Sequence, residues 1–358
     1  MKIAYDAKRY YHNQTGLGNY SRTLVGDVSS MYADDVEVML YDCKTWERTF
    51  RLGRKAAKDG CTLFHGLSNE LPRDIVRSAV PSIVTMHDVA WRTYPAMYKP
   101  WDRLIYDWKY GWSARHATHV VCISEATKRE VMRYYHVPEE RISVIYQPVA
   151  PLYYTPMGKN DADDIIRHSL PYLHERSYIL TVGSINSRKN LMNMVKAYAT
   201  LPSGDRPMFI VVGNGREYRH KVEAYINENG LQNDIRIESN IHDAQALQAL
   251  YTRALLLMYP SFCEGFGLPV VEASLQRCPV ITSNISSLPE AAGPAAVQCN
   301  PASVQELADA LHMLLRNTEE RTRRGIQARE YCLSMFNPDE LTRQMFELYK
   351  KVSTQSSL

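Results

Sequence analysis

The sequence predicts an α/β protein with two facing, Rossmann-like domains, each a doubly wound parallel sheet. Short apolar runs rich in Val and Ile alternate with longer amphipathic segments along the whole chain. Such runs are expected of strands in a parallel sheet that helices cover on both faces. Their alternation with helical segments indicates a doubly wound topology. The chain has 358 residues, which is too long for one ordinary core and suits two domains.

The apolar runs fall into two sets, separated by a segment with a different composition. Residues 149–173 contain Pro, Asp and Asn and are predicted to be a linker. A helix pattern begins near Asn337 and Pro338. We expect an N-terminal domain of residues 1–155, a C-terminal domain of residues 156–335, and a final helix in residues 336–358 that packs back on the first domain. The predicted strands are residues 2–6, 36–42, 62–66, 82–88, 119–124 and 142–148 in the first domain, and 178–184, 208–214, 235–239, 255–261, 279–284 and 296–300 in the second.

Composition and charge narrow the class of protein. Hydrophobic residues make up 45% of the chain and charged residues 23%, and the formal charge of +3 gives no bulk electrostatic reason to bind nucleic acid. No apolar run reaches the roughly 18 residues of a membrane span. The sequence opens with a strand-like segment and no signal-peptide region, so we expect a cytoplasmic location. Seven scattered cysteines without a CxxC pair argue against disulfides and structural zinc.

The most informative motif is PSFCEGFGLPVVEA, at positions 260–273. Ligands of open α/β sheets bind beyond the carboxyl ends of the strands, and here we expect them in a cleft between the domains. Pro269 suits the first turn of a helix, whose free N–H groups and positive dipole end can bind an anion. Gly267 allows a ligand to approach the backbone closely. Glu264 and Glu272 beside an anion site suggest a ligand with both phosphates and hydroxyls, although an ordinary capping loop is the alternative.

Charged residues follow two other predicted strands. Arg188 and Lys189 lie at a strand-to-helix junction, where a guanidinium and an ammonium could clamp a diphosphate. Taken alone, they could equally be a solvated pair. His87 ends a strand of the first domain and could donate to, or polarise, a bound group near neutral pH. A structural histidine with satisfied hydrogen bonds is the alternative for this residue.

A glycine-containing motif, TGLGNYS, follows the first strand and enters a predicted helix at positions 15–21. It approximates the GxGxxG fingerprint of dinucleotide-binding domains. That fingerprint must follow its strand immediately, whereas about ten residues intervene here and Ser21 replaces the third glycine. A dehydrogenase is therefore not favoured.

Together these motifs resemble glycosyltransferase family four, the retaining nucleotide-sugar transferases of GT-B fold. The glutamate pair with seven residues between, Glu264 and Glu272, carries the resemblance. Five other motifs occur in the family's order and cover nearly the whole chain: TGLGNYSRTL, TMHDVAW, CISEATKREVM, VGSINSRKN and ITSNISSLPEAAG. A looser resemblance is to bacterial mannosyltransferases that build O-antigen and related surface polysaccharides.

The resemblance implies a role for each matching residue. Glu264 would face the donor sugar's hydroxyls, Arg188 and Lys189 would neutralise the diphosphate leaving group, and His87 would approach the sugar from the other domain. Family members need no metal, so no cofactor is expected beside the sugar nucleotide. Glu272 would hold the nucleotide ribose. The other positions implied in donor binding are Gly16, Gly18, Gly183, Ser184, Phe266, Gly267 and Leu268.

The acceptor is expected on the first domain. The segment from Arg92 to Arg115 holds seven aromatic, five basic and two acidic residues. Such a mixture suits a membrane interface and a lipid-linked acceptor, with peripheral contact to the inner face of the cytoplasmic membrane. The candidate residues are Asp88, Arg92, Trp101 and Trp108. The alternative is a helix that packs its aromatic side chains into the core.

The resulting prediction is a hexosyltransferase that moves mannose from GDP-mannose to a saccharide or lipid-linked acceptor. A UDP-sugar donor carrying glucose, galactose or N-acetylglucosamine remains open, because residues 240–243 lack the glycine that family members have near the base. Arg277 stands where the family usually has a glycine. Two further classes of protein stay open: a sugar-nucleotide epimerase, which shares the fold, and a non-catalytic nucleotide-sugar-binding protein.

Overall fold

The computed structural model describes residues 1–13, 16–241 and 243–354. It divides into two units, one formed by the described parts of Met1–Ala150 and Phe336–Leu358, the other by Pro151–Met335. Each unit contains a six-stranded sheet with parallel pairing throughout. The predicted class, an α/β protein with two doubly wound parallel sheets, is confirmed, and each predicted apolar run contains a strand.

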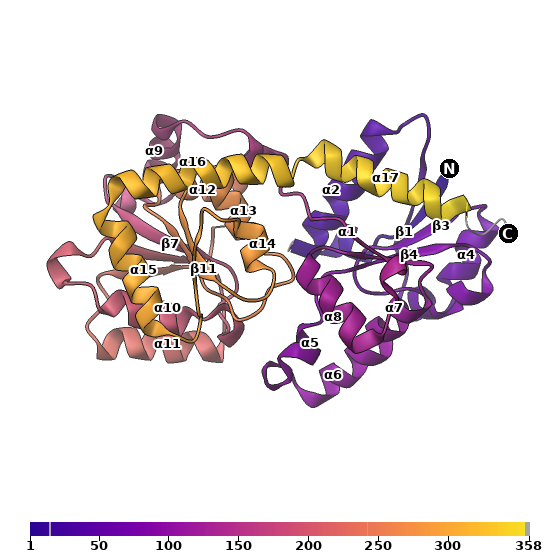
Figure 1. The fold of residues 1–358 in the computed structure, drawn as a ribbon, viewed down its shortest axis with the longest axis horizontal. Helices are drawn as coiled ribbons and strands as arrows, with labels where there is room; N and C mark the ends of the chain where they lie inside the picture. Colours follow the sequence, from indigo (N-terminus) through magenta and orange to yellow (C-terminus); the bar gives the residue numbers. More distant parts are fainter. Residues whose placement is uncertain (14–15, 242, 355–358) are drawn as a thin grey trace. The chain divides into compact units, whose positions relative to one another are not determined.

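The first unit has the sheet order β2-β1-β3-β4-β5-β6. Helix α17 contacts α2 and β3, whereas α7 contacts β4 and α8 contacts β5, so helices cover both faces of this sheet (Figure 1). Its strands are β1 (Lys2–Asp6), β2 (Glu37–Tyr41), β3 (Leu63–Gly66), β4 (Ser82–Met86), β5 (His119–Cys122) and β6 (Ile142–Val144). Its helices are α1 (Lys8–His12), α2 (Gly16–Met31), α3 (Thr45–Phe50), α4 (Leu52–Lys58), α5 (Ala90–Thr93), α6 (Pro100–Tyr106), the π-helical turn η3 (Asp107–Gly111), α7 (Trp112–His116), α8 (Glu125–Tyr135) and α17 (Pro338–Thr354).

The second unit has the sheet order β12-β11-β10-β7-β8-β9. Helices α10, α11 and α15 form one layer beside this sheet, and α9, α12, α13 and α16 form the other (Figure 1). Its strands are β7 (Tyr178–Val182), β8 (Met208–Val212), β9 (Ile235–Glu238), β10 (Leu257–Tyr259), β11 (Val280–Ser283) and β12 (Val297–Cys299). Its helices are α9 (Lys159–Ser169), α10 (Leu191–Ala199), α11 (Glu217–Glu228), α12 (Ala244–Arg253), α13 (Leu268–Leu275), α14 (Leu288–Ala292), α15 (Val304–Arg316) and α16 (Thr318–Met335).

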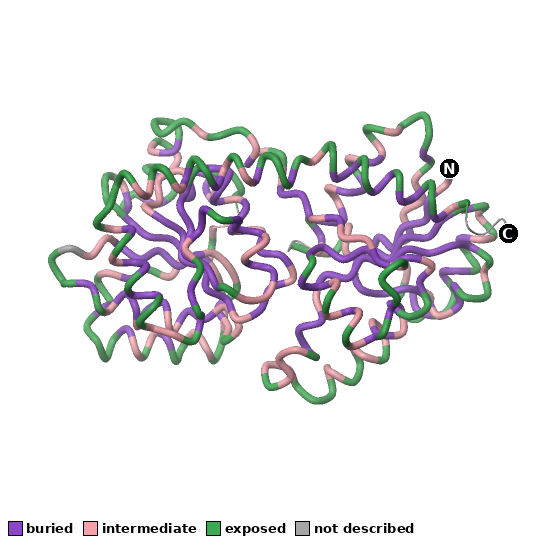
Figure 2. Tube along the Cα trace, in the orientation of Figure 1, coloured by how far each residue is buried: buried purple, intermediate pink, exposed green. Residues whose placement is uncertain are grey.

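The central strands are buried along their whole length. All five residues of β4 and all five of β8 are buried, as a parallel strand between two helical layers requires. Figure 2 shows the strands buried in both units and the exposed residues on the outer sides of the helices. The apolar runs therefore form the two cores, and the residues that follow each strand lie at the carboxyl edge of its sheet.

The segment between the units is more structured than the linker that the sequence predicts. Residues 159–169 form α9, because Ala162 and Ile166 lie one helical turn apart and are both buried. Asp163 of this helix pairs with Arg253 of α12 at 2.6 Å. The unit boundary lies at residues 150/151 rather than 155/156, because Tyr153 already packs in the second unit, where its carbonyl accepts a hydrogen bond from Gln276 Nε2 at 2.7 Å.

The C-terminal helix belongs to the first unit. The side chain of Asn337 accepts a hydrogen bond from the Glu340 amide at 3.1 Å at the beginning of α17. Further along, the buried Tyr349 hydroxyl lies 2.7 Å from His65 Nδ1 of β3. Among the described residues, no helix combines the length and apolarity that crossing a bilayer requires.

Candidate active site

Two loops at the carboxyl edge of the second sheet meet because their strands are neighbours. Strand β7 pairs with β10, although about 75 positions separate them in the chain. The turn η7 (Ser187–Lys189) follows β7, and Pro260 follows β10. Asn190 joins the two loops: its side chain donates to the Pro260 carbonyl at 3.0 Å and to the Pro301 carbonyl at 2.7 Å. Asn190 has a φ of 64°, a left-handed conformation that Asn tolerates better than most residues.

The carboxylate of Glu264 lies between the two cations that the sequence predicts for the site. Glu264 Oε2 is 2.9 Å from Arg188 Nη1, and Oε1 is 2.7 Å from Lys189 Nζ. The Lys189 ammonium also contacts the hydroxyl of Tyr259 at the end of β10. Arg188 donates in addition to the Cys263 carbonyl at 2.5 Å. The structure thus brings Arg188, Lys189 and Glu264 into one ionic cluster.

Burial and charge act against each other within this cluster. Burial disfavours ionisation of Glu264, but the charges of Lys189 and Arg188 outweigh it and hold the pKa of the carboxyl below its usual value. Burial lowers the pKa of Lys189, and the charge of Glu264 partly opposes that shift. Only 8% of the Glu264 side chain is exposed, against 25% of that of Arg188. The cluster therefore concentrates positive charge at a partly accessible edge.

The glycine-rich loop after Glu264 is held in place by two serines. The Ser286 hydroxyl accepts from the Glu264 amide at 3.0 Å and donates to its carbonyl at 2.8 Å. The Ser287 hydroxyl lies 2.9 Å from the Glu264 carbonyl and 2.8 Å from that of Phe266. Both serines belong to the ITSNISSLPEAAG motif. Their role was not predicted from the sequence, because it depends on the contact between the loops after β10 and β11.

Helix α13 begins where the sequence predicts an anion-binding helix end. Gly267 precedes it with a φ of 118°, which residues with a side chain rarely adopt. Leu268 and Pro269 form the first turn. Phe266 and Gly267 are buried, and Leu268 is half-buried. The first N–H groups of such a helix have no partner within the helix, so this end can bind an anion next to the cationic cluster.

Glu272 lies on α13, in a different environment from Glu264. Its Oε2 accepts a hydrogen bond from the Tyr251 hydroxyl at 3.0 Å. Burial raises the pKa of Glu272 to about 7, and the hydrogen bond from Tyr251 opposes that rise. The two glutamates therefore differ in kind: Glu264 is ionised against cations, and Glu272 titrates near neutral pH.

Two predicted donor-binding residues lie at the end of β7. Gly183 has a φ of 139°, and a side chain there would meet the Lys189 Cε atom at 3.4 Å. Ser184 is exposed, and its hydroxyl accepts from Asn186 Nδ2 at 3.0 Å. A small recess next to Lys189 is lined by Gly183, Ser184 and Tyr259, among others. These backbone positions are accessible beside the cluster.

In the first unit, His87 follows β4 and only 5% of it is exposed. Its Nε2 lies 2.9 Å from the carbonyl of Leu67, so this nitrogen is the donor and carries the proton. Burial lowers the pKa of His87 to about 4, so the ring is neutral near pH 7. We expected His87 to donate to or polarise a bound group. In this tautomer Nδ1 is a hydrogen-bond acceptor, which suits a sugar hydroxyl better.

Gly16 and Gly18 lie in the first turn of α2, which begins at Gly16. A Cβ atom on Gly18 would lie 1.8 Å from the carbonyl oxygen of Asn13, so no larger residue fits there without a backbone shift. The Gly16 carbonyl accepts from Gln147 Nε2 at 3.3 Å. Thr15 of the same motif, and His242 of the loop at 240–243, lie outside the described residues.

The aromatic segment of the first unit divides into a buried and an exposed face. Tyr98, Tyr106, Tyr110 and Trp112 pack against the core. On the other face, four apolar residues at helical spacing are 48–75% exposed: Trp101, Leu104, Ile105 and Trp108. Arg92 pairs with Asp107 at 2.7 Å, and Asp88 accepts a hydrogen bond from the Ala90 amide at 3.2 Å. Core packing therefore accounts for one face of the segment, and the other face is apolar and exposed.

The described residues contain no group of three or more His, Cys, Asp or Glu side chains arranged to hold a metal ion. The groups gathered at the edge of the second sheet are instead cations, free helix N–H groups and two acids. Such a set can bind a ligand that combines phosphates with hydroxyls.

Comparison with known proteins gives two family matches and related curated proteins. Residues 163–331 match the profile described as Glycosyl transferases group 1, and residues 43–151 match that described as Glycosyltransferase Family 4. The Escherichia coli O-antigen chain mannosyltransferase B is 29% identical over 80% of this chain and 74% of its own. The Salmonella typhimurium O-antigen chain mannosyltransferase RfbU is 27% identical over 61% of this chain, and the match covers 56% of the relative.

Solved structures with the same fold include two proteins matched over nearly their full length. Sucrose-phosphate synthase from Thermosynechococcus elongatus has a TM-score of 0.78 and 19% identity over 99% of this chain and 100% of that one. HepE from Anabaena in complex with UDP has a TM-score of 0.77 and 16% identity over 98% of this chain and 100% of that one. At these identities the likeness shows the fold, which agrees with the fold implied by the sequence motifs.

Proposed function

Because the chain belongs to glycosyltransferase family four, with the GT-B fold, we propose that it moves mannose from GDP-mannose to a saccharide or lipid-linked saccharide acceptor. The reaction would serve the synthesis of a surface polysaccharide. The ionic cluster of Arg188, Lys189 and Glu264, beside the first turn of α13, carries the proposal. It supplies the positive charge that a departing nucleoside diphosphate requires.

The cluster favours the transition state more than the bound donor. Negative charge grows on the diphosphate as its bond to the sugar breaks, and fixed cations stabilise that growing charge. Arg188 and Lys189 are already oriented by Glu264, so little reorganisation is needed when the charge develops. No divalent cation enters this scheme, since the two side chains provide its positive charge.

The two glutamates would contact hydroxyls at opposite ends of the donor. Glu264 is ionised and can accept hydrogen bonds from the sugar, and Glu272 can accept them from the ribose. The backbone of Phe266, Gly267 and Leu268 between them would contact the sugar or a phosphate. The neutral Nδ1 of His87 would accept from a sugar hydroxyl. Retention of anomeric configuration, as in the family, completes the scheme.

The choice of mannose rests on the relatives. The two curated relatives are named as O-antigen chain mannosyltransferases, and both are close to 30% identical to this chain. The UDP bound to HepE belongs to a protein of 16% identity, which supports the fold and not the donor. A UDP-sugar is therefore the competing donor that the first experiment must include.

The experiment is a panel of sugar nucleotides tested on the purified protein without acceptor and with a chelator present. Thermal unfolding and slow donor hydrolysis are measured for GDP-mannose and for the UDP-sugars of glucose, galactose and N-acetylglucosamine. We expect GDP-mannose alone to stabilise the protein and to be hydrolysed. A UDP-sugar in that position would overturn the mannose assignment, and no response to any donor would overturn the transferase assignment.

A lipid-linked acceptor agrees with the exposed face of α6 and η3. Trp101, Leu104, Ile105 and Trp108 recur at three- and four-residue intervals, the spacing of one helix face. Such a face can enter the interface of a bilayer. Sedimentation with anionic liposomes at low salt tests this part: we expect retention of the protein, and its loss on substitution of Trp101 and Trp108 by Ser. Failure of the unaltered protein to sediment contradicts the membrane assignment.

A further inference from the structure

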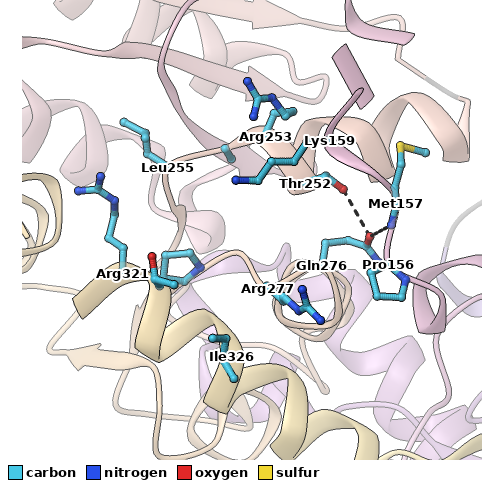
Figure 3. A pocket seen from close by; sticks show the side chains of 13 residues that line it. Pro156, Met157, Lys159, Thr252, Arg253, Leu255, Gln276, Arg277, Arg321 and Ile326 are labelled. Carbon is cyan, nitrogen blue, oxygen red and sulfur yellow. Dashed lines mark hydrogen bonds between the residues drawn. The ribbon is translucent and has the colours of Figure 1, made fainter. Parts of the chain in front are cut away.

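The second unit has a pocket at the sheet edge opposite the candidate active site. Its lining includes Leu255 and Pro279, the residues just before β10 and β11, whereas the ionic cluster follows β7 and β10. The pocket has a volume of about 400 Å³. It is lined by side chains of α9, α12 and α16 and of the segment that follows α13, as Figure 3 shows.

The charge of the pocket lining is entirely positive. Four of its residues are cationic, and no Asp or Glu of the described chain lines it: the cations are Lys159, Arg253, Arg277 and Arg321. Arg253 is neutralised by Asp163 at 2.6 Å. The other three have no acidic partner within ion-pair distance among the described residues. Positive charge that lines a pocket without counter-charge favours the binding of an anion there.

Arg277 is the second observation that points to a ligand. Arg277 has a φ of 61°, the left-handed conformation usually given to glycine just after a helix end. Its amide donates to the Ser274 carbonyl at 2.9 Å as α13 ends. Its carbonyl packs so closely on α16 that a Cβ atom on Gly325 would lie 2.1 Å from it. Arg277 thus contributes a cation to the pocket lining at a position where glycine would fit the backbone better.

The walls of the pocket are fixed by hydrogen bonds. Gln276 Oε1 accepts from the Met157 amide at 3.0 Å and from the Thr252 hydroxyl at 3.4 Å, the two dashed lines in Figure 3. The Arg321 guanidinium donates to the carbonyls of Leu314 and Leu315 at 2.5 and 2.7 Å. Leu255 and Ile326 add apolar surface. Apolar surface beside fixed cations suits an organic molecule that carries phosphate.

We propose that this pocket binds a small phosphorylated molecule through Lys159, Arg277 and Arg321, at a site separate from the donor site. The ligand carries at least two negative charges, because three cations lack counter-charge. Its uncharged part lies on Leu255 and Ile326. Binding at this place would let a soluble phosphorylated compound influence the unit that holds the donor.

Isothermal titration with inorganic pyrophosphate at constant ionic strength tests the proposal on the full chain. The doubly substituted K159A/R277G protein is expected to lose at least about 10-fold in pyrophosphate affinity at this site, since each charge-assisted bond is worth that much or more. Arg188→Ala removes a cation of the donor site and should leave this binding intact. The double variant should still show the donor-induced thermal shift, because neither residue lies in the candidate active site.

Two control variants separate binding from folding and from general charge effects. His136, like Arg277, has a left-handed backbone conformation, with a φ of 53°, but it does not line the pocket. His136→Gly should therefore leave pyrophosphate affinity unchanged. Lys221→Ala removes an exposed cation of α11 with the same expectation. Abolition of all pyrophosphate binding by Arg188→Ala would overturn the proposal. Unchanged pyrophosphate affinity in K159A/R277G would also overturn it. The proposal would fail as well if the protein bound phosphatidylglycerol vesicles through this pocket but did not bind pyrophosphate.

Discussion

Removing the charge of Glu264 is expected to destabilise the second unit strongly. The substitution Glu264→Gln keeps the shape of the side chain but leaves Arg188 and Lys189 beside each other without counter-charge. It also places an amide N–H₂ group against one of the two cations. The ion pairs that it breaks are short, at 2.9 and 2.7 Å, and the carboxylate is almost wholly buried.

The structure gives the size of this effect. Breaking a buried ion pair by removing one partner costs about 3–5 kcal/mol. We take about 3 kcal/mol, because a quarter of the Arg188 side chain is exposed and water can partly solvate it. For a unit of the size of Pro151–Met335, each kcal/mol lowers the midpoint of thermal unfolding by about 2–4 °C. Glu264→Gln should therefore lower that midpoint by about 6–12 °C.

Thermal unfolding with and without a nucleoside diphosphate measures this effect. A bound diphosphate returns negative charge to the two cations, so it should raise the midpoint of Glu264→Gln more than that of the unaltered protein. Glu223→Gln is the matched control, because Glu223 pairs with Arg219 at 2.7 Å on partly exposed side chains of α11. That pair is worth less than about 1 kcal/mol. Equal midpoints for Glu264→Gln and Glu223→Gln would refute the role of Glu264 as the buried counter-charge.

Three further predictions follow from the site and from α2. Lys189→Ala should lower the transfer rate about 10²–10³-fold, and it should also lower the unfolding temperature because it removes one partner of the buried Glu264 carboxylate; a near-normal rate would contradict a role in charge stabilisation. Because the folded-state pKa of Glu272 is raised to about 7, its protonated form is favoured by folding. Its contribution to stability is therefore lost as the pH rises from about 4.5 to 7, while donor affinity rises over the upper part of that range as the carboxylate forms. Tyr251→Phe removes a hydrogen bond that lowers this pKa, so titrations of donor affinity should move to higher pH, and an unmoved profile would exclude Glu272 as the titrating group. Gly18→Ala should destabilise the first unit by about 1–3 kcal/mol, because the added Cβ atom would clash with a backbone carbonyl. Gly26→Ala is the control on the same helix: its Cβ atom would meet open space, so it should stabilise the unit by up to about 1 kcal/mol. Chemical denaturation measures both changes in the free energy of unfolding.

Several features of this protein were predictable from local sequence. Residues 208–212 are apolar at every position, and such a continuous apolar run is typical of a strand buried on both faces of a sheet. Arg188, Lys189 and His87 could be placed after strands because the strand ends were clear. The beginning of α13 was equally predictable, since Gly267 and Pro269 have strong local preferences.

Local composition misled the prediction at one segment. Residues 159–169 contain many Asp and Asn, which suggested a linker, yet the segment forms α9. Only two of its residues, Ala162 and Ile166, are buried, and contact with α12 stabilises the helix. A short helix with so small an apolar face depends on its tertiary neighbour rather than on intrinsic propensity.

The pairing of charges was decided by the tertiary structure. Glu264 was expected to face the sugar, and nothing in the sequence indicates that Arg188 and Lys189 hold its carboxylate. That contact exists because β7 and β10 are neighbours in the sheet, a fact set by strand order. The roles of three further residues were not predicted for the same reason: Asn190, Ser286 and Ser287. Their partners lie on loops that follow other strands.

Of the four cations in the pocket of the second unit, the sequence singled out one, and the tertiary structure brings them together. Arg277 was recognisable as a departure from the family's glycine, but Lys159, Arg253 and Arg321 are ordinary surface residues in the sequence. Local preferences along the chain determine strands, helix ends and turns, since these depend on neighbouring residues. Charge clusters form between side chains from segments that are distant in the sequence. Only the tertiary structure therefore determines which charged side chains come close enough to interact strongly.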